Sequence, residues 1–315
     1  MTYLLFFLGF VVLILGANWM VEGASALGNK LRLPPIVIGL TIVAIGTSLP
    51  ELVINTIASI NGITDLAISN VLGSNILNIL IILGITALIY PLGIPHATSK
   101  NEIPFSFIAT ITLGILASDM SIFGAKVNLI GFWDGFIFIL LFIGFLLYSL
   151  RLGKQIKPEP YTMKFSWIKA LLFIVLGLAG LYWGGQWIVN GTVDIAVLFG
   201  ISKGTVGLTI VAFATSLPEL VTSVVASVKK KNEIAVGNVI GSCIFNITLV
   251  LGVSAMITPL PFATASMLDL GMVLAANAFL FVFVFTGRGR KISRFEGGLL
   301  IAIYIFYLIF TFNLR

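Results

Sequence analysis

Two segments of the chain each place a proline and a glutamate inside an otherwise apolar stretch. The first is Gly39-Leu-Thr-Ile-Val-Ala-Ile-Gly-Thr-Ser-Leu-Pro-Glu51, and residues 207–219 repeat it with only two changes. Each copy puts a carboxylate next to the hydroxyls of a Thr-Ser pair. Carboxylate and hydroxyl oxygens are hard ligands that suit Ca²⁺ or Na⁺ better than a soft transition metal. The pattern therefore predicts a cation site that contains Glu51 and Glu219.

The proline in each copy adds a second kind of oxygen donor. Proline has no N–H and its ring clashes with the carbonyl four residues back, so Pro50 and Pro218 free the carbonyls of Gly46 and Ala214 from helical hydrogen bonds. Freed carbonyls inside a membrane are tolerated where they line a site or a water-filled cavity. We therefore expect a broken helix at each glutamate, with backbone oxygens facing the site.

A second duplicated motif follows each of the first two. Residues 70–78, Asn-Val-Leu-Gly-Ser-Asn-Ile-Leu-Asn, are matched by residues 238–246, at the same offset of 168 residues that separates the two glutamates. Ser74 and Asn78 are four apart and share one helix face, as do Ser242 and Asn246. Together the two halves would form a compact oxygen cage with two negative charges. Gly73 and Gly241 would let a neighbouring helix approach closely.

The amino-acid composition indicates that this chain lies in a lipid bilayer. Hydrophobic residues make up 59% of its 315 residues, charged residues 10%, and the mean hydropathy is +1.13. A soluble globule needs more polar surface, so an integral membrane protein in a lipid bilayer is predicted. The net charge of +6 fits basic loops that face an anionic leaflet and predicts no nucleic-acid partner.

Single residues exclude other classes of protein. Cys243 is the one cysteine, which excludes an intrachain disulfide and predicts a buried thiol. His96 is the one histidine and falls in a loop after a proline, so the histidine ligands of a metal-dependent hydrolase are missing. We therefore predict a protein that is not an enzyme and that needs no cofactor and no obligate protein partner.

Hydropathy predicts ten membrane spans, near residues 3–27, 35–60, 66–90, 103–118, 128–150, 167–190, 204–228, 234–258, 267–286 and 296–313. With ten spans, fifteen of the eighteen lysines and arginines fall on one side, and only Lys126, Lys203 and Arg315 on the other. The positive-inside rule makes the basic side cytoplasmic, which places both termini outside the cell.

Five spans separate equivalent positions of the two copies, and an odd number means that the second copy enters the membrane from the opposite side. The predicted fold is all-α integral membrane, with ten transmembrane helices as two inverted five-helix repeats. The first repeat covers residues 1–150 with its motifs in 36–84, a cytoplasmic linker covers 151–165, and the second repeat covers 166–315 with its motifs in 204–252. Such duplicated, broken helices are typical of secondary transporters whose site lies at the repeat interface.

These motifs resemble the two alpha-repeats of the cation/calcium exchanger superfamily, most closely its prokaryotic Na⁺/Ca²⁺ exchanger-like branch. The resemblance implies alternating access in which Ca²⁺ and Na⁺ compete for one midplane site and the first spans of the two halves move. The ligands it implies in the first half are the Ala44 carbonyl, Thr47, Ser48, Glu51, Ser74 and Asn78. In the second half they are the Ala212 carbonyl, Thr215, Ser216, Glu219, Ser242 and Asn246.

Some features bear on the choice of ion. An amide at both Asn78 and Asn246 argues against use of K⁺, because some members, among them the K⁺-dependent branch, have an aspartate there. The Thr-Ser-Leu-Pro lead into each glutamate favours Na⁺ over H⁺ as the coupling ion. A Ca²⁺/H⁺ antiporter and a passive cation channel stay open as alternatives. Glu22 has Asn190 as its counterpart, so it is expected to be a charge at the end of a span or in a vestibule and not a ligand.

Overall fold

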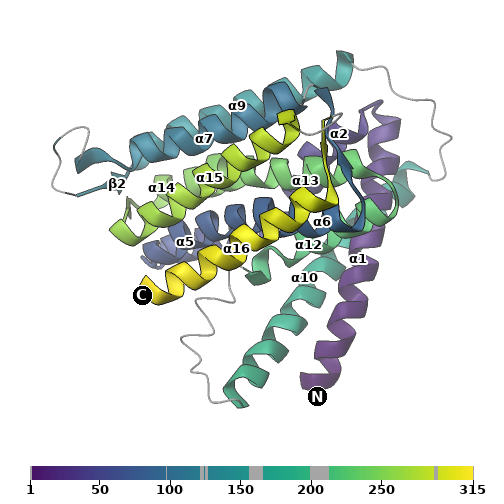
Figure 1. Cartoon of the computed structure of the whole chain (residues 1–315). Helices are drawn as coiled ribbons and strands as arrows, with labels where there is room; N and C mark the ends of the chain where they lie inside the picture. Colours follow the sequence, from purple (N-terminus) through teal and green to yellow (C-terminus); the bar gives the residue numbers. More distant parts are fainter. Residues whose placement is uncertain are drawn as a thin grey trace.

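The computed structural model describes residues 2–96, 98–120, 124, 127–155, 166–198, 213–286 and 290–314, and it is almost entirely helical (Figure 1). The long helices are α1 (Thr2–Lys30), α9 (Phe132–Gln155), α10 (Trp167–Leu198), α15 (Thr264–Thr286) and α16 (Arg294–Leu314). The shorter ones are α2 (Pro35–Ile38), α3 (Ala44–Thr47), α4 (Leu49–Ile60), α5 (Thr64–Ile76), α6 (Leu83–Ile89), α7 (Ile103–Leu116), α12 (Leu217–Val228), α13 (Asn232–Phe245) and α14 (Gly252–Ile257). Four π-helical turns connect some of them: η1 (Gly39–Val43), η2 (Leu77–Ile82), η3 (Thr98–Glu102) and η4 (Asn246–Leu251).

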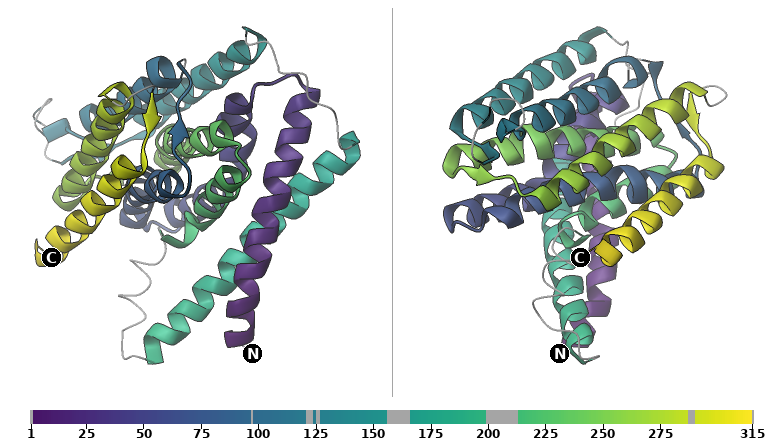
Figure 2. Two further views of the ribbon diagram at one scale, coloured as in Figure 1. Left: turned by 45° about the vertical axis from the view of Figure 1, so that its right-hand side comes forward. Right: turned by 60° about the vertical axis from the view of Figure 1, so that its left-hand side comes forward.

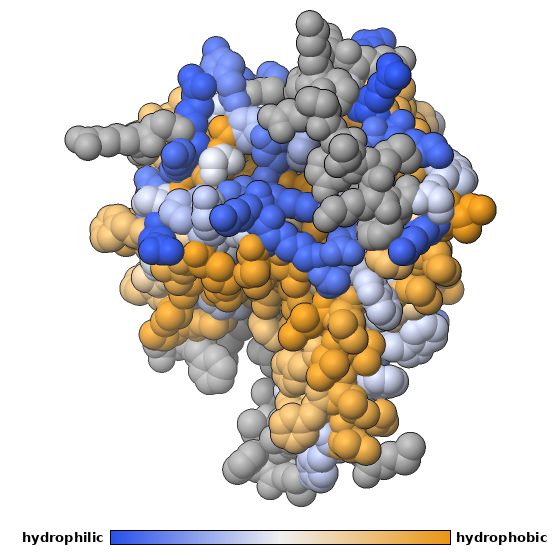
Figure 3. All heavy atoms as spheres, turned by 90° about the vertical axis from the view of Figure 1, so that its right-hand side faces the viewer, coloured by the Kyte–Doolittle hydropathy of each residue, from blue (hydrophilic) through white to orange (hydrophobic). Residues whose placement is uncertain are grey.

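The helices have the length and polarity of membrane spans. Within the described ranges, seven helical stretches are long and apolar enough to cross a bilayer, and the bent pair Pro35–Thr47 and Leu49–Ile60 makes an eighth. In Figure 3 hydrophilic residues gather over the upper part of the visible face, and hydrophobic residues cover the flanks below and much of the arm that projects downward. The protein is therefore an all-helical, multi-pass membrane protein. The predicted fourth span corresponds to the short helix α7, which follows the turn η3 in the chain. Part of the predicted seventh span, residues 204–212, lies outside the described residues.

The loops contain short strands of two residues each, which the sequence analysis did not predict. Strand β1 (Leu92–Gly93) pairs with β4 (Lys291–Ile292), and β2 (Leu129–Ile130) pairs with β3 (Leu260–Pro261). Each antiparallel pair joins a loop of the first half to a loop of the second. Hydrophobic periodicity does not reveal such pairs, because two residues are too few to show an alternation.

Helices α1 and α10 form an antiparallel pair that stands to one side of the other helices (Figures 1 and 2). Glycines let the two backbones touch: a Cβ added at Gly9 would lie 2.9 Å from the Gly184 carbonyl oxygen, and one at Gly16 would lie 2.9 Å from the Gly177 oxygen. Positions 177 and 184 are the 168-residue counterparts of 9 and 16. Each contact thus joins a glycine of one copy to the counterpart of the other glycine, as a twofold axis requires.

The second duplicated motifs lie in the most enclosed helices. In an apolar window of 18 residues within Thr64–Ile89 and within Asn232–Ile257, 72% and 78% of the window is buried, whereas the corresponding windows of the other five candidate spans are between 11% and 39% buried. The helix that precedes the predicted linker continues to Gln155, and residues 156–165 of that linker lie outside the described part. The fold therefore places Ser74, Asn78, Ser242 and Asn246 at the centre of the bundle.

Candidate functional site

Both helices that carry the first motif break one residue before a leucine-proline pair, as predicted. Helix α3 ends at Thr47 and α4 starts at Leu49, with Ser48 at φ −87° and ψ 6° between them and a bend of 43°. In the second copy Ser216 has φ −84° and ψ 0° before α12. Ser48 and Ser216 thus have nearly the same backbone conformation although the first copy has Gly46 where the second has Ala214.

The Glu219 carboxylate is held by residues of both copies. Its Oε1 accepts a hydrogen bond from Ser48 Oγ at 2.9 Å and lies 3.4 Å from Ser242 Oγ. The two serine hydroxyls are 3.0 Å apart. Glu219 Oε2 has no hydrogen-bond partner. The helix break of the first copy and the carboxylate of the second therefore belong to one site.

The same region contains buried oxygens that have no hydrogen-bond partner. Both oxygens of the Glu51 carboxylate are unpartnered, and the residue is 0% exposed. Further buried, unpartnered oxygens belong to Ser74, Asn78, Ser216 and Asn246. Burial of polar atoms without partners is unfavourable, and native proteins satisfy nearly all of them. A bound cation would satisfy carboxylate, hydroxyl and amide oxygens together.

The threonines of the first motif bond across the repeats. Thr47 Oγ1 donates to Asn238 Oδ1 at 3.1 Å, and its counterpart Thr215 Oγ1 donates to Asn70 Oδ1 at 3.2 Å. A hydroxyl that donates its proton keeps lone pairs free to accept or to bind a cation. The asparagines thus orient the threonine oxygens, a role that the sequence reasoning missed. The offset marks 70 and 238 as counterparts, as are 47 and 215, but it does not show which asparagine each threonine meets.

A second layer of polar residues holds these asparagines in place. Asn70 Nδ2 donates to Asn55 Oδ1 at 2.7 Å, and Asn238 Nδ2 donates to Ser223 Oγ at 3.0 Å. Positions 55 and 223 are again counterparts. The close helix approach expected at Gly241 is present, since an added Cβ there would lie 2.9 Å from the Leu40 carbonyl oxygen.

Asn75 is another residue that the motif reasoning passed over. Its Nδ2 donates to the Cys243 carbonyl at 3.2 Å, and its Oδ1 accepts from Asn246 Nδ2 at 3.1 Å. The amide nitrogen of Asn246 is thereby fixed and its oxygen is left free. Asn78 lies in η2 and Asn246 begins η4, so a π-helical turn occurs at this asparagine in both copies. Such turns are frequent at functional sites, and no sequence signal predicted them.

Of the two alanine carbonyls that the sequence analysis named, only that of Ala44 lies in the described part of the chain. The Ala44 oxygen accepts the Ser48 N–H at 3.0 Å and lies 3.4 Å from Thr47 Oγ1. Ala212 lies outside the described residues. The Ala44 carbonyl therefore has a helical partner in this conformation, and its second lone pair remains for another donor or a cation.

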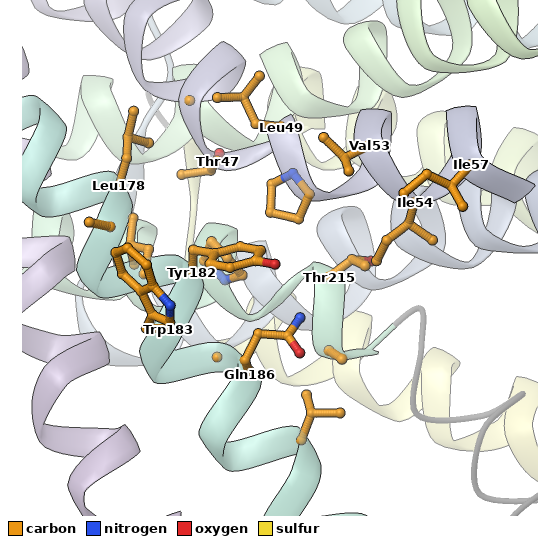
Figure 4. A pocket seen from close by; sticks show the side chains of 18 residues that line it. Thr47, Leu49, Val53, Ile54, Ile57, Leu178, Tyr182, Trp183, Gln186 and Thr215 are labelled. Carbon is orange, nitrogen blue, oxygen red and sulfur yellow. The ribbon is translucent and has the colours of Figure 1, made fainter. Parts of the chain in front are cut away.

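A cavity of about 690 Å³ reaches both helix breaks. Figure 4 shows Thr47 and Thr215 on its wall, together with Tyr182, Trp183 and Gln186 of α10. Its wall is otherwise mainly apolar and includes side chains of α4. The two threonines thus line a cavity that lies between α4 and α10.

The single cysteine and the single histidine lie where the sequence analysis expected them. Cys243 is a buried free thiol. His96 is exposed, and the positive charges of Arg290 and Lys100, with Arg290 the larger cause, lower the pKa of its imidazole. In the described part of the chain, no group of three or more His, Cys, Asp or Glu residues could hold a metal ion. The site instead offers two carboxylates within a set of neutral oxygens.

Comparison with known proteins shows which family has this sequence and fold. Residues 1–151 and 169–313 match the profile of the family described as sodium/calcium exchanger protein. The chain is a member of the sodium/calcium exchanger family. It is 38% identical over 317 residues to the putative antiporter CaxA of Alkalimonas amylolytica, which covers 97% of each chain. It is 30% identical over 346 residues to the sodium/calcium exchanger MaX1 of Methanosarcina acetivorans, covering 99% of this chain and 98% of that one.

The fold of this family member also matches a solved structure. Against the sodium-calcium exchanger NCX_Mj soaked with 10 mM Na⁺ and zero Ca²⁺, the TM-score is 0.85 at 30% identity, and the match covers 98% of both chains. The inverted repeat that the sequence predicts is consistent with that fold. The family assignment and the paired glutamates therefore point to the same class of transporter.

Proposed function

We propose that this protein is a secondary antiporter that exchanges Ca²⁺ for Na⁺ across the cell membrane, by alternating access to one site near the middle of the bilayer. The observation that carries the proposal is the set of buried, unpartnered oxygens around Glu51 and Glu219. Family membership and the resemblance to a sodium-calcium exchanger support it. Ten spans in two inverted repeats, residues 1–150 and 166–315, complete the proposal.

The proposed ligands are the side-chain oxygens of Thr47, Ser48, Glu51, Ser74, Asn78, Thr215, Ser216, Glu219, Ser242 and Asn246, with the carbonyls of Ala44 and Ala212. Two carboxylates neutralise one Ca²⁺, and the hydroxyl and amide oxygens complete the six to eight ligands that Ca²⁺ takes. Na⁺ uses the same hard oxygens, so the two ions compete. Competition for one site couples their movements without ATP and without a cofactor.

The geometry supports alternating access in a specific way. The site joins the helix break of one copy to the carboxylate of the other, so a movement of one group of helices changes which end of the site is open. The pair of α1 and α10 stands to one side of the other helices (Figure 2) and is the proposed moving group. An empty site with two negative charges is unfavourable in hydrocarbon, which opposes movement without a bound ion.

The test is exchange by the purified chain in proteoliposomes. Vesicles loaded with Na⁺ are expected to take up ⁴⁵Ca²⁺ when the outside contains no Na⁺, and uptake is expected to stop when Na⁺ is equal on both sides. Uptake that ignores Na⁺ and follows a pH gradient supports Ca²⁺/H⁺ exchange, for which the same two buried carboxylates would carry the protons. Ca²⁺ flux without any counter-ion gradient supports a passive channel.

A further inference from the structure

A small polar cluster joins α1 to the end of α12, away from the proposed site. Lys229 Nζ lies 2.6 Å from Glu22 Oε1, and Lys231 Nζ donates to Ser25 Oγ at 2.8 Å. Glu22 and Ser25 lie on one face of α1, since they are three residues apart. Two lysines of one turn thus hold one face of the helix that we propose to move.

The sequence does not provide this cluster with a counterpart in the other half. At the offset of 168 residues, Glu22 and Ser25 correspond to Asn190 and Val193, and Lys229 and Lys231 correspond to Asn61 and Ile63. Valine and isoleucine side chains form no hydrogen bond, and two asparagines form no ion pair. The glycine contacts of α1 and α10 are symmetric, whereas the sequence provides no residues for this ionic connection at the positions that the offset relates to it.

The ionic connection and the cavity lie at different levels of the α1/α10 pair. A Cβ added at Gly23, next to Glu22, would meet the carbonyl oxygen of Ala170 at 2.8 Å, so Glu22 lies level with the first turn of α10. The cavity is lined by α10 residues from Leu178 to Val189, farther along the same helix. The cavity includes Thr47 and Thr215 in its wall. Near the lysines, in contrast, Ala24 and Ala226 are 0% exposed and belong to a hydrophobic cluster.

From this arrangement we propose that Glu22–Lys229, with Ser25–Lys231, is a latch that closes the lysine end of the transport path and thereby sets how often the site opens to that side. The four are positioning residues, because none of them contacts the proposed ion ligands in the contacts described above. The charge distribution predicts that the lysine end is cytoplasmic. This proposal rests on the proposed alternating access. It adds that the state open to the lysine end and the state open to the other end differ in free energy.

The size of the effect follows from the exposure of the pair. The side chains of Lys229 and Glu22 are 26% and 34% exposed, so solvent screens their attraction. Ion pairs of this kind change equilibria by about 0.2–1 kcal/mol, which corresponds to a change of up to about fivefold in the ratio of the two access states. Apparent affinity on each side scales with the fraction of protein that faces that side.

The experiment compares Glu22→Gln, Lys229→Gln and the charge swap Glu22→Lys with Lys229→Glu, each as full-length protein in vesicles of known orientation. The single variants are expected to bind Ca²⁺ up to about fivefold more tightly from the lysine end and correspondingly more weakly from the other. The charge swap is expected to restore much of the original ratio, and raised salt is expected to reduce the difference. Lys230→Gln is the matched control, because it removes one charge from the same turn at an exposed position and is expected to leave the ratio unchanged.

A second measurement does not depend on transport. In a Cys243→Ala background, a cysteine at the buried position Ala226 is expected to react faster with a membrane-impermeant thiol reagent in the latch variants than in the unmodified latch. Equal labelling in both, or equal two-sided affinities in folded variants that exchange normally, would overturn the latch and leave the proposed function intact. Faster labelling in a chain that shows no exchange would keep the latch and overturn the proposed function. If one of the two single variants does not fold, the other still tests the latch, because it removes the same ion pair by changing the other residue.

Discussion

Neutralisation of either central glutamate is expected to remove Ca²⁺ binding without loss of the fold. Glu51→Gln and Glu219→Gln each keep the shape of the side chain and remove one of the two charges. In Glu219→Gln the amide oxygen can still accept from Ser48, whose hydroxyl lies 2.9 Å from Oε1. In Glu51→Gln no described hydrogen bond is lost, because both carboxylate oxygens are unpartnered.

The magnitude follows from burial and charge. Both residues are 0% exposed. Removal of one partner of a buried ion pair costs ~3–5 kcal/mol, and we apply this cost to a carboxylate that faces bound Ca²⁺. Since ~1.4 kcal/mol is a factor of ten, affinity for Ca²⁺ should fall by a factor of about 100 to 4,000. Ca²⁺ present at 100 times its original dissociation constant stabilises the protein by ~2.7 kcal/mol, and a 100-fold weaker site reduces this to ~0.4 kcal/mol.

Two assays read the change: ⁴⁵Ca²⁺ uptake in Na⁺-loaded proteoliposomes, and thermal unfolding in detergent with and without Ca²⁺. The matched control is Glu102→Gln, since Glu102 is also 0% exposed but accepts a hydrogen bond from Tyr148 at 2.5 Å between η3 and α9. This variant is expected to retain uptake and Ca²⁺-dependent stabilisation. Uptake within threefold of the original in a folded Glu51→Gln or Glu219→Gln protein would remove that carboxylate from the site.

Three further outcomes are expected. In a Cys243→Ala background, Ile63→Cys and Lys230→Cys should react with an impermeant thiol reagent from opposite sides of the membrane, because the repeats are inverted; reaction from the same side contradicts the ten-span topology. Exchange of three Na⁺ for one Ca²⁺ moves one net charge, worth ~2.3 kcal/mol per 100 mV, so a positive-inside K⁺/valinomycin potential should accelerate Ca²⁺ entry into Na⁺-loaded vesicles, and an unchanged rate argues for electroneutral exchange. Gly16→Ala should destabilise the protein by ~1–3 kcal/mol, because its Cβ would lie 2.7 Å from the Leu181 backbone nitrogen. Gly144→Ala, with nothing within 4 Å of the added atom, should not destabilise it in thermal unfolding.

The sequence by itself determined the features that depend on composition and on local chain geometry. Its apolar content identified a membrane protein, and the prolines before Glu51 and Glu219 predicted the two helix breaks, because a missing N–H acts within one turn of helix. The offset of 168 residues predicted which positions are equivalent, and the odd number of spans between them predicted inversion. These inferences need no knowledge of which segments touch.

Only the tertiary structure decided which of these residues meet. Thr47 pairs with Asn238 and Thr215 with Asn70, across separations of 191 and 145 residues, and the repeat alone does not say whether such bonds form within one copy or between copies. The Glu22–Lys229 pair spans 207 residues, whereas the lack of an acidic counterpart to Glu22 suggested only a charge at the end of a span or in a vestibule. The π-helical turns at Asn78 and Asn246 gave no sequence signal, since the same residues also fit an ordinary α-helix. Packing of the central helices decides these features, because it sets the distances over which short-range hydrogen bonds and ion pairs can form.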